Sequence, residues 1–217
     1  MIIAIDGPAA SGKSTVGRLV AERLGYLYLD TGAMYRALTL KAIERGVDLK
    51  NERALIDLAR KTQIDLKVGR GGELKVFLGQ RDVTHEIRAP GITNEVSYIA
   101  KVGGVRERMV NLQREIGQKK NIVVEGRDIG TVVFPKADKK FYLDAHFKER
   151  ARRRYKELCQ SGRSVRLENV EEELCIRDEK DRTREVGPLK KAFDAIHLDT
   201  THLTIEEVVD RICSHLG

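Results

Sequence analysis

The chain has little of what marks a secreted, zinc-stabilised or membrane-spanning protein. It has three cysteines, Cys159, Cys175 and Cys213, and none of them has the short paired spacing of a zinc site or a disulfide framework. The five histidines follow no metal-ligand spacing either. No apolar run approaches the roughly 20 residues that cross a bilayer, and a strand expected from Ile2 leaves no room for a signal peptide. We therefore expect a cytoplasmic protein with reduced thiols.

Aromatic residues are also scarce, with five Phe, six Tyr and no Trp. This scarcity counts against binding of single-stranded RNA, which uses aromatic stacking positions along a basic groove. The net charge of +7 is concentrated, because residues 148–166 contain eight Lys or Arg and two Glu. Such a local cluster suits a compact polyanion, such as the phosphates of a nucleotide, at least as well as a long duplex.

One stretch near the N-terminus has a spacing typical of phosphate binding. Gly7-Pro8-Ala9-Ala10-Ser11-Gly12-Lys13-Ser14-Thr15, here called the phosphate loop, fits the pattern G-x-x-x-x-G-K-[ST]. An apolar run that is expected to be a strand precedes it, and helical periodicity follows it. An ordinary glycine-rich turn between a strand and a helix is the alternative, but the flanking elements favour a site for a nucleoside triphosphate.

The chemistry of phosphate binding explains these residue types. Glycines allow successive main-chain N–H groups to point inward at phosphate oxygens, and the start of the helix adds a positive electrostatic field. Lys13 would reach the β- and γ-phosphates of ATP, and the Ser14 hydroxyl would bind Mg²⁺. The loop residues expected to bind ATP are Gly7, Pro8, Ala9, Ala10, Ser11, Gly12, Lys13, Ser14 and Thr15.

Five short apolar segments alternate with segments of helical periodicity. They are expected to be strands at Ile2–Ile5, Tyr26–Leu29, Asn121–Val124, Lys140–Ala145 and Ala195–Asp199. Strands that alternate with helices are typical of an α/β fold in which helices flank a parallel sheet. We predict a P-loop protein with a five-stranded parallel sheet flanked by helices.

Two insertions are expected to interrupt this core, at residues 31–115 and 148–185. Within the first, apolar and polar residues alternate over residues 63–84 around Gly69–Gly72 and Gly79-Gln80, which predicts a small antiparallel meander. Toward the end of the chain, Thr204 to Glu207 predicts a capping box that opens the last helix. The expected division is a core at 1–30 with the phosphate loop, an insertion at 31–115, core at 116–147, Arg-rich helices at 148–185 and core at 186–217.

Polar and charged residues follow the ends of the second and third predicted strands. Thr31 and Arg36 open a helix, where Thr31 could be a plain N-cap and Arg36 a solvated arginine. Because α/β sheets bind ligands beyond the carboxyl ends of their strands, their position favours a ligand role. The third strand leads into Glu125-Gly126-Arg127-Asp128-Ile129-Gly130-Thr131, whose charges are hard to explain by packing. We predict that this turn faces a ligand.

The basic cluster lies on a predicted helix, and a second helix follows it. Arginines within Arg150–Arg154 surround an apolar stripe on the first helix, although such charged runs are usually solvated. The second helix is expected to begin near Asn169, with Asn169 as its N-cap. Arg177, Asp181 and Arg184 would then share one stripe, and surface ion pairs could explain them equally well.

Four motifs together resemble the bacterial cytidylate kinase family, in that family's order. They are the phosphate loop, Asp30-Thr31-Gly32-Ala33-Met34-Tyr35-Arg36, the segment from Glu125 through Arg127-Asp128 to Pro135, and Arg177-Asp178-Glu179-Lys180-Asp181-Arg182-Thr183-Arg184. The resemblance covers essentially the whole chain, and the meander resembles the insert that separates the bacterial type from shorter eukaryotic relatives. It implies a nucleoside monophosphate kinase that transfers the γ-phosphate of ATP to CMP or dCMP with Mg²⁺.

The resemblance also implies roles for segments and residues. Residues 31–115 would bind the nucleoside monophosphate, and 148–185 would include a lid over ATP. The residues implied at the CMP phosphate are Arg36, Arg127 and Arg184. Those implied at the cytosine are Ser97, Arg106 and Asp128, and those at the sugar are Thr31, Arg177 and Asp181. The catalytic set would be Lys13, Arg127, Arg184, Arg150 and Arg154, with Ser14 as the metal ligand.

Two alternatives stay open at this point. A P-loop kinase that acts on UMP, AMP or a small metabolite would have the same phosphate loop, and only Ser97, Arg106 and Asp128 favour cytosine. The pI of about 9.3 suggests an ATP-regulated RNA-binding protein. Such a protein would need aromatic stacking positions along a basic stripe, and the sequence shows none. We expect a monomer whose partners are ATP and CMP or dCMP, without nucleic acid or a membrane.

Overall fold

The computed structural model describes residues 1–68, 74–118 and 121–216. The chain forms two compact units, which we describe one at a time. The first unit consists of Met1–Leu27 and Asn121–Gly217, and the second of Tyr28–Lys120. Within the described ranges, no helix is both long enough and apolar enough to cross a bilayer. The predicted turn at Gly69–Gly72 lies outside these ranges.

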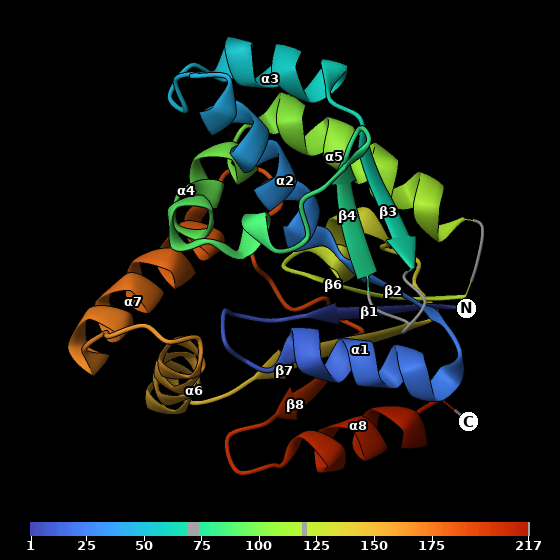
Figure 1. Ribbon diagram of the computed structural model, residues 1–217. Coiled ribbons are helices and arrows are strands. Elements are labelled where there is room, and N and C mark those ends of the chain that lie inside the picture. Colours follow the sequence, from blue (N-terminus) through green and yellow to red (C-terminus); the bar gives the residue numbers. More distant parts are fainter. Residues whose placement is uncertain (69–73, 119–120, 217) are drawn as a thin grey trace. The chain divides into compact units, whose positions relative to one another are not determined.

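A five-stranded parallel sheet has the strand order β2-β6-β1-β7-β8 (Figure 1). Its strands are β1 (Ile2–Asp6), β2 (Leu27–Asp30), β6 (Ile122–Gly126), β7 (Lys139–Asp144) and β8 (Ile196–Asp199). The predicted sheet is thus confirmed. The central strand β1 pairs with β6 and β7, and Asp6 at its end lies opposite Gly126 and Tyr142. The segments that follow β1 and β6 therefore leave the sheet side by side.

Helices cover the central strands of the first unit. Ile3, Ile5 and Val123 have no exposed surface, as expected for parallel strands buried on both faces. Helix α1 (Lys13–Leu24) packs on β6 and on α8 (Ile205–Ser214). The predicted capping box is confirmed, since Thr204 and Glu207 each bind the other's main-chain N–H at the start of α8. A short π-helical turn, η2 (Ile129–Val133), follows β6.

Helices α6 (Phe147–Gln160) and α7 (Leu167–Thr183) pack against each other in the same unit. The predicted N-cap of α7 at Asn169 was wrong. The main-chain N–H of Val170 already donates to the Arg166 oxygen at 3.2 Å, so the helix begins at Leu167. Asn169 therefore lies within the first turn, where its own backbone is helical and cannot act as an N-cap.

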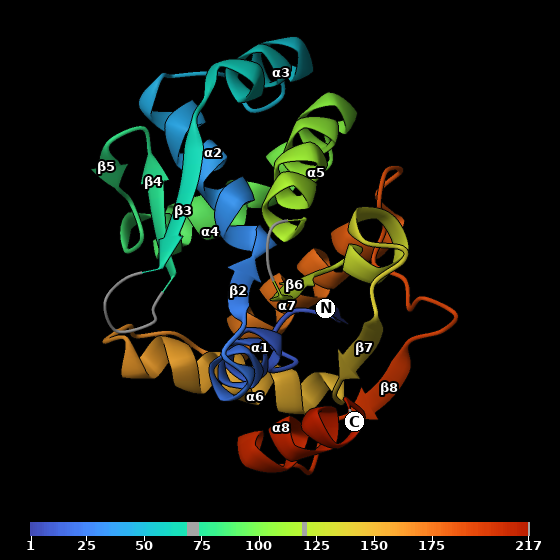
Figure 2. The same ribbon diagram turned by 90° about the vertical axis from the view of Figure 1, so that its right-hand side faces the viewer.

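The second unit contains helices and a small antiparallel sheet (Figure 2). The helices are α2 (Thr31–Glu44), α3 (Glu52–Lys61), the 3₁₀ turn η1 (Glu86–Arg88), α4 (Pro90–Ala100) and α5 (Gly103–Gly117). The strands β3 (Ile64–Val68), β4 (Leu74–Leu78) and β5 (Arg81–Asp82) form the predicted meander in the order β3-β4-β5. Helix α2 packs against β4, α4 and η1, which gives this unit its own core.

Candidate functional site

The phosphate loop leads from β1 into α1 without a side chain that caps the helix. Gly12 is the N-cap residue and has left-handed backbone angles, φ 94° and ψ −1°. The first turn of α1 contains no acidic residue. A helix start leaves main-chain N–H groups without partners inside the helix, and its electrostatic field favours negative charge. The β1–α1 turn is therefore suited to bind an anion.

Gly7 allows the phosphate loop to pass close to β7. Its φ is 152°, and a Cβ atom at this position would lie 2.0 Å from the main-chain oxygen of Leu143. Only glycine fits there without a shift of the strand. Among the described residues, Ala10 is the one residue other than glycine with a positive φ, at 58°. The loop thus has a backbone conformation that its surroundings must hold in place.

Lys13 is buried at the end of the loop. Its Nζ donates to the Pro8 main-chain oxygen at 2.6 Å and lies 3.3 Å from Ser11 Oγ. Burial, followed by the nearby Arg127 guanidinium, lowers the pKa of Lys13 to about 7. A phosphate would stabilise the charged amine and raise that pKa again, because an opposite charge favours the ionised form.

Asp6 connects the end of β1 to the turn after β6. Its Oδ1 and Oδ2 accept from the main-chain N–H groups of Ile129 and Gly130, both at 2.8 Å. Burial raises the pKa of Asp6 to about 6, although these two hydrogen bonds act in the opposite direction. The contacts fix the turn that carries Arg127 and Asp128, directly beside the phosphate loop.

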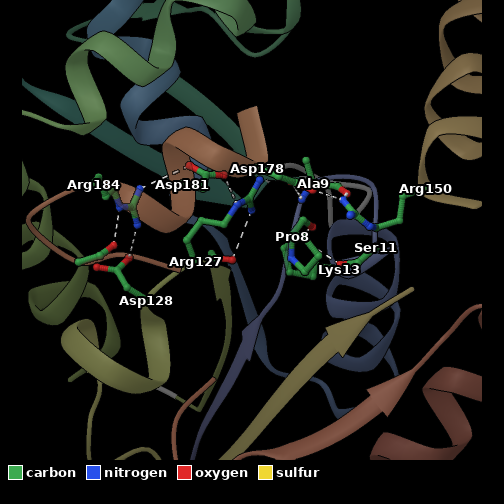
Figure 3. Close-up of polar contacts among 12 residues, drawn as sticks. Pro8, Ala9, Ser11, Lys13, Arg127, Asp128, Arg150, Asp178, Asp181 and Arg184 are labelled. Atoms are coloured by element: carbon green, nitrogen blue, oxygen red, sulfur yellow. Dashed lines mark hydrogen bonds and ion pairs between the residues drawn. The ribbon is translucent and has the colours of Figure 1, made fainter. Parts of the chain in front are cut away.

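Ion pairs connect the turn after β6 to the end of α7 (Figure 3). Arg127 Nε donates to Asp181 Oδ2 at 2.7 Å, while Arg184 Nη2 lies 3.4 Å from Asp128 Oδ1 and Arg184 Nη1 lies 3.7 Å from Asp181 Oδ1. Burial acts to raise the pKa of Asp181, but the charges of Arg127, Arg177 and Arg184 lower it overall. Asp181 is thus held as an anion among arginines.

The two α6 arginines predicted to be catalytic have different surroundings. Arg150 is 6% exposed, and its Nη1 donates to Asp178 Oδ2 at 2.5 Å. Arg154 Nη1 lies 2.8 Å from Glu157 Oε2, one turn along the same helix. Their assignment to a lid over ATP stays a prediction.

In the second unit, Asp30 organises the start of α2. Its carboxylate accepts from Ala33 N at 3.0 Å and from Arg36 Nη2 at 2.7 Å. Burial acts to raise the pKa of Asp30, but Arg36 and Arg88 lower it overall. Asp30 rather than Thr31 is therefore the N-cap, and the buried Thr31 is the first helical residue. Gly32 leaves room for this pair, since a Cβ there would lie 3.0 Å from Arg36 Nη1.

The other two predicted residues of this unit lie on neighbouring helices. Ser97 is half-buried on α4, and Arg106 is 2% exposed on α5. Arg106 Nη1 donates to the Ala100 oxygen at 3.1 Å, and its guanidinium lies 5.6 Å from the centre of the Tyr35 ring. These contacts fix Arg106 within the unit, so a ligand would meet a preset guanidinium.

The structure thus divides the predicted site residues between the two units. The first unit joins the phosphate loop to the set Arg127, Asp128, Arg150, Asp181 and Arg184. Arg177 is half-buried on α7, and its charge contributes to lowering the pKa of both Lys13 and Asp181. The second unit contains Thr31, Arg36, Ser97 and Arg106.

Sequence reasoning gave no role to three acidic residues that organise these groups. They are Asp6, Asp30 and Asp178. The N-cap preference of Asp after a strand could have indicated Asp30. Asp6 and Asp178 have no such local signal, because Asp6 binds the N–H of Ile129 and Asp178 contacts Arg150 and Ala9, which lie 28 and 169 residues away in the sequence.

The donor set around the phosphate loop fits a magnesium ion that binds together with a nucleotide. Within residues 1–68, 74–118 and 121–216, no group of three His, Cys, Asp or Glu side chains could hold a metal ion. Mg²⁺ commonly keeps several waters and binds through few protein groups together with phosphate oxygens. Ser14 is exposed in the first turn of α1 and would hold the ion, with Glu125 a partner through water. The bound ion supplies charge neutralisation at the phosphates.

The fold and the phosphate loop define a P-loop protein of the α/β class. An uncharacterized protein from Eubacterium ventriosum has a similar fold, with a TM-score of 0.52 at 12% identity over 100% of this chain and 98% of that one. The arginines beside the loop indicate phosphoryl transfer within this class, because that chemistry depends on charge neutralisation.

Sequence comparison identifies the family. The family model described as cytidylate kinase matches residues 3–216. A cytidylate kinase from Bacillus licheniformis is 50% identical over 98% of this chain and 94% of its own length. One from Clostridioides difficile is 47% identical over 100% of this chain and 98% of its own. The chain therefore belongs to the cytidylate kinase family, as its motifs predicted.

Proposed function

We propose that the protein transfers the γ-phosphoryl group of ATP to CMP or dCMP, which yields ADP and CDP or dCDP. Membership of the family supports the reaction. The observation that carries the donor half is the β1–α1 turn, which presents uncapped main-chain N–H groups beside the buried Lys13. These groups would bind the β- and γ-phosphates, with Mg²⁺ at Ser14.

In the transfer step, an oxygen of the CMP phosphate attacks the γ-phosphorus of ATP. A new P–O bond forms as the bond from the γ-phosphorus to the bridging oxygen breaks, and ADP leaves with that electron pair. The acceptor phosphate is already ionised near neutral pH, so the step needs no strong general base. Cations that stabilise the loose, highly charged transition state would supply most of the catalysis. The proposed cations are Lys13, Arg127, Arg150, Arg154 and Arg184.

We propose that three arginines hold the phosphate of the acceptor. Arg36, Arg127 and Arg184 would hold its phosphate, since guanidinium groups match phosphate geometry. Each of these arginines already has a carboxylate within 3.4 Å, namely Asp30, Asp181 and Asp128 in that order. Such partners support the proposal, because they limit the side-chain entropy that would be lost on binding.

Cytosine recognition would depend on donor and acceptor groups. The N4 amino group of cytosine is a donor that the Asp128 carboxylate can accept, and its O2 and N3 atoms are acceptors for Arg106. Uracil has an oxygen instead of the amino group and would face the Asp128 carboxylate unfavourably. Ser97 would complete the base contacts, and Thr31, Arg177 and Asp181 would lie at the sugar.

The test is a coupled assay of ADP release with a panel of monophosphates at fixed Mg-ATP, with products identified by chromatography. We expect kcat/KM for CMP or dCMP to exceed that for UMP and AMP by at least about tenfold, the discrimination that lost base hydrogen bonds provide. A faster reaction with UMP or AMP would refute the proposed acceptor but leave phosphoryl transfer intact. ADP release that is independent of every monophosphate would refute kinase activity.

A further inference from the structure

The main chain of Ala9, in the middle of the phosphate loop, is bound on both sides by one buried ion pair (Figure 3). Arg150 Nη1 donates to the Ala9 oxygen at 3.1 Å, and the Ala9 N–H lies 3.4 Å from Asp178 Oδ1. The two side chains also bind each other, with Arg150 Nη1 donating to Asp178 Oδ2 at 2.5 Å. One peptide segment of the loop is thus attached to α6 and α7 together.

Apolar packing supports the same attachment. The Ala9 side chain forms a small buried cluster with Ala151 and Leu174. Ala151 is the neighbour of Arg150 on α6, and Leu174 lies one turn before Asp178 on α7. Arg150 is itself fixed, because its Nε donates to the Ala145 oxygen at 3.0 Å. The Arg150 guanidinium therefore contacts the loop in a fixed orientation.

A second attachment lies two residues further along the loop. Thr200 Oγ1 is 3.2 Å from the Ser11 main-chain oxygen and accepts from Arg153 Nη1 at 3.0 Å. Between the attachments at Ala9 and Ser11 lies Ala10, with its positive φ of 58°. A left-handed conformation at a residue other than glycine is unfavourable and persists only where the surroundings impose it.

We infer that Asp178 is a positioning residue for nucleotide binding, which holds Ala9 through its own contact with the Ala9 N–H and through Arg150, and thereby holds the conformation of the phosphate loop. We assign it no contact with either substrate. Its role is to keep Arg150 oriented, so that the loop N–H groups and Lys13 are in place before ATP arrives. The inference rests on the proposed function only in that the phosphate loop binds the nucleotide.

The test is calorimetric titration of the whole chain with Mg-ADP in the absence of any acceptor. The main variant replaces the pair with apolar residues, Arg150→Met with Asp178→Leu, so that no unpaired charge stays buried. We expect its Kd for Mg-ADP to rise about tenfold, as expected for the loss of one or two hydrogen bonds that preorganise the loop. The KM for ATP should rise in parallel, whereas the KM for CMP should change less than about twofold.

A second variant, Asp178→Asn, keeps the size and one acceptor oxygen but loses the charge. We expect an intermediate effect of about threefold on the Kd for Mg-ADP, because hydrogen bonds to charged groups are the stronger ones. Its matched control is Glu179→Gln, which removes the next carboxylate along α7. Glu179 is exposed and pairs with Arg182 at 3.6 Å, so its variant should bind Mg-ADP like the unaltered chain.

The outcomes separate positioning from packing. If the double variant folds and binds Mg-ADP as tightly as the unaltered chain, the pair only joins α6 to α7 and the inference is wrong. Because Arg150 is itself a proposed catalytic cation, Asp178→Asn, which keeps Arg150, decides the case whether or not the double variant folds: affinity for Mg-ADP equal to that of the unaltered chain would show that the inference is wrong. A chain that binds Mg-ADP but does not phosphorylate CMP would refute the proposed function and leave this titration valid.

Discussion

The β1–α1 turn and the β2–α2 turn both lead from a parallel strand into a helix, but they treat the start of that helix differently. At the first turn, Gly12 has no side chain to cap α1. At the second, the Asp30 carboxylate caps α2 and binds Arg36. The first turn therefore leaves main-chain N–H groups to a ligand anion, whereas the second binds the Ala33 N–H with its own Asp30 carboxylate and presents a guanidinium.

This difference separates two ways to bind phosphate. Main-chain N–H groups and one buried lysine form a rigid, closely spaced cradle, which suits the polyphosphate of ATP. An arginine oriented by its own carboxylate partner is a side-chain donor that suits a single phosphate group. We expect the donor nucleotide to depend on the first turn and the acceptor to depend on the second.

The largest expected effect is that of Lys13→Ala. It removes the cation at the donor phosphates and should lower kcat by about a thousandfold or more, the loss typical of a central electrostatic stabiliser. Steady-state kinetics at saturating ATP and CMP measure it. Turnover within about tenfold of the unaltered chain would exclude Lys13 from the mechanism.

Arg36→Met tests the second turn and should act on the acceptor alone. Loss of charge-assisted hydrogen bonds to the CMP phosphate should raise the KM for CMP by about a hundredfold. The Kd for Mg-ADP, measured by titration without CMP, should stay within about twofold. Equal losses for both ligands would show that the two turns do not bind separate phosphates.

Asp128→Ala should weaken base recognition more than phosphate recognition. We expect the KM for CMP to rise about tenfold, because one base hydrogen bond is lost, while kcat/KM for UMP changes less. The ratio of kcat/KM for CMP to kcat/KM for UMP measures the effect. Arg184 lies 3.4 Å from Asp128, so the variant also removes an ion-pair partner of Arg184. A collapse of Mg-ADP affinity instead would assign Asp128 to the metal or donor site.

A smaller effect follows from the burial of Lys13. Its pKa of about 7 in the free protein leaves it mostly neutral at pH 8.5, and bound phosphates raise that pKa, so binding should take up close to one proton. At pH 6.0 Lys13 is already charged and contributes no uptake. Titrations with Mg-ADP at pH 8.5 in buffers of different ionisation enthalpy count the protons. Lys13→Met should abolish the uptake, and a buffer-independent enthalpy in the unaltered chain would contradict the prediction.

The sequence predicted the parallel sheet and the phosphate loop well, because both depend on local patterns. Strand periodicity and the spacing of Gly7, Gly12 and Lys13 are readable within a few residues. The capping box at Thr204 is equally local, and the structure confirms it. The error at the start of α7 has a similar origin, since Asn169 has the right residue type for a cap but lies two residues inside the helix.

The contacts that hold the candidate site together could not be predicted in this way. Asp6 binds N–H groups 123 and 124 residues away, and Asp178 lies 169 residues from Ala9. An isolated aspartate carries no signal of such a partner before the fold is known. The motifs predicted which side chains would meet ligands, but they did not indicate which carboxylates position those side chains.

The most direct test of the account is a crystal structure of the protein with Mg-ADP bound. We predict that the β-phosphate lies in the β1–α1 turn, within hydrogen-bond distance of the main-chain N–H groups at the start of α1 and of Lys13 Nζ. The Asp30 cap and its bond to Arg36 should persist at the β2–α2 turn. A β-phosphate bound anywhere else, with Lys13 Nζ not in contact with it, would contradict the account.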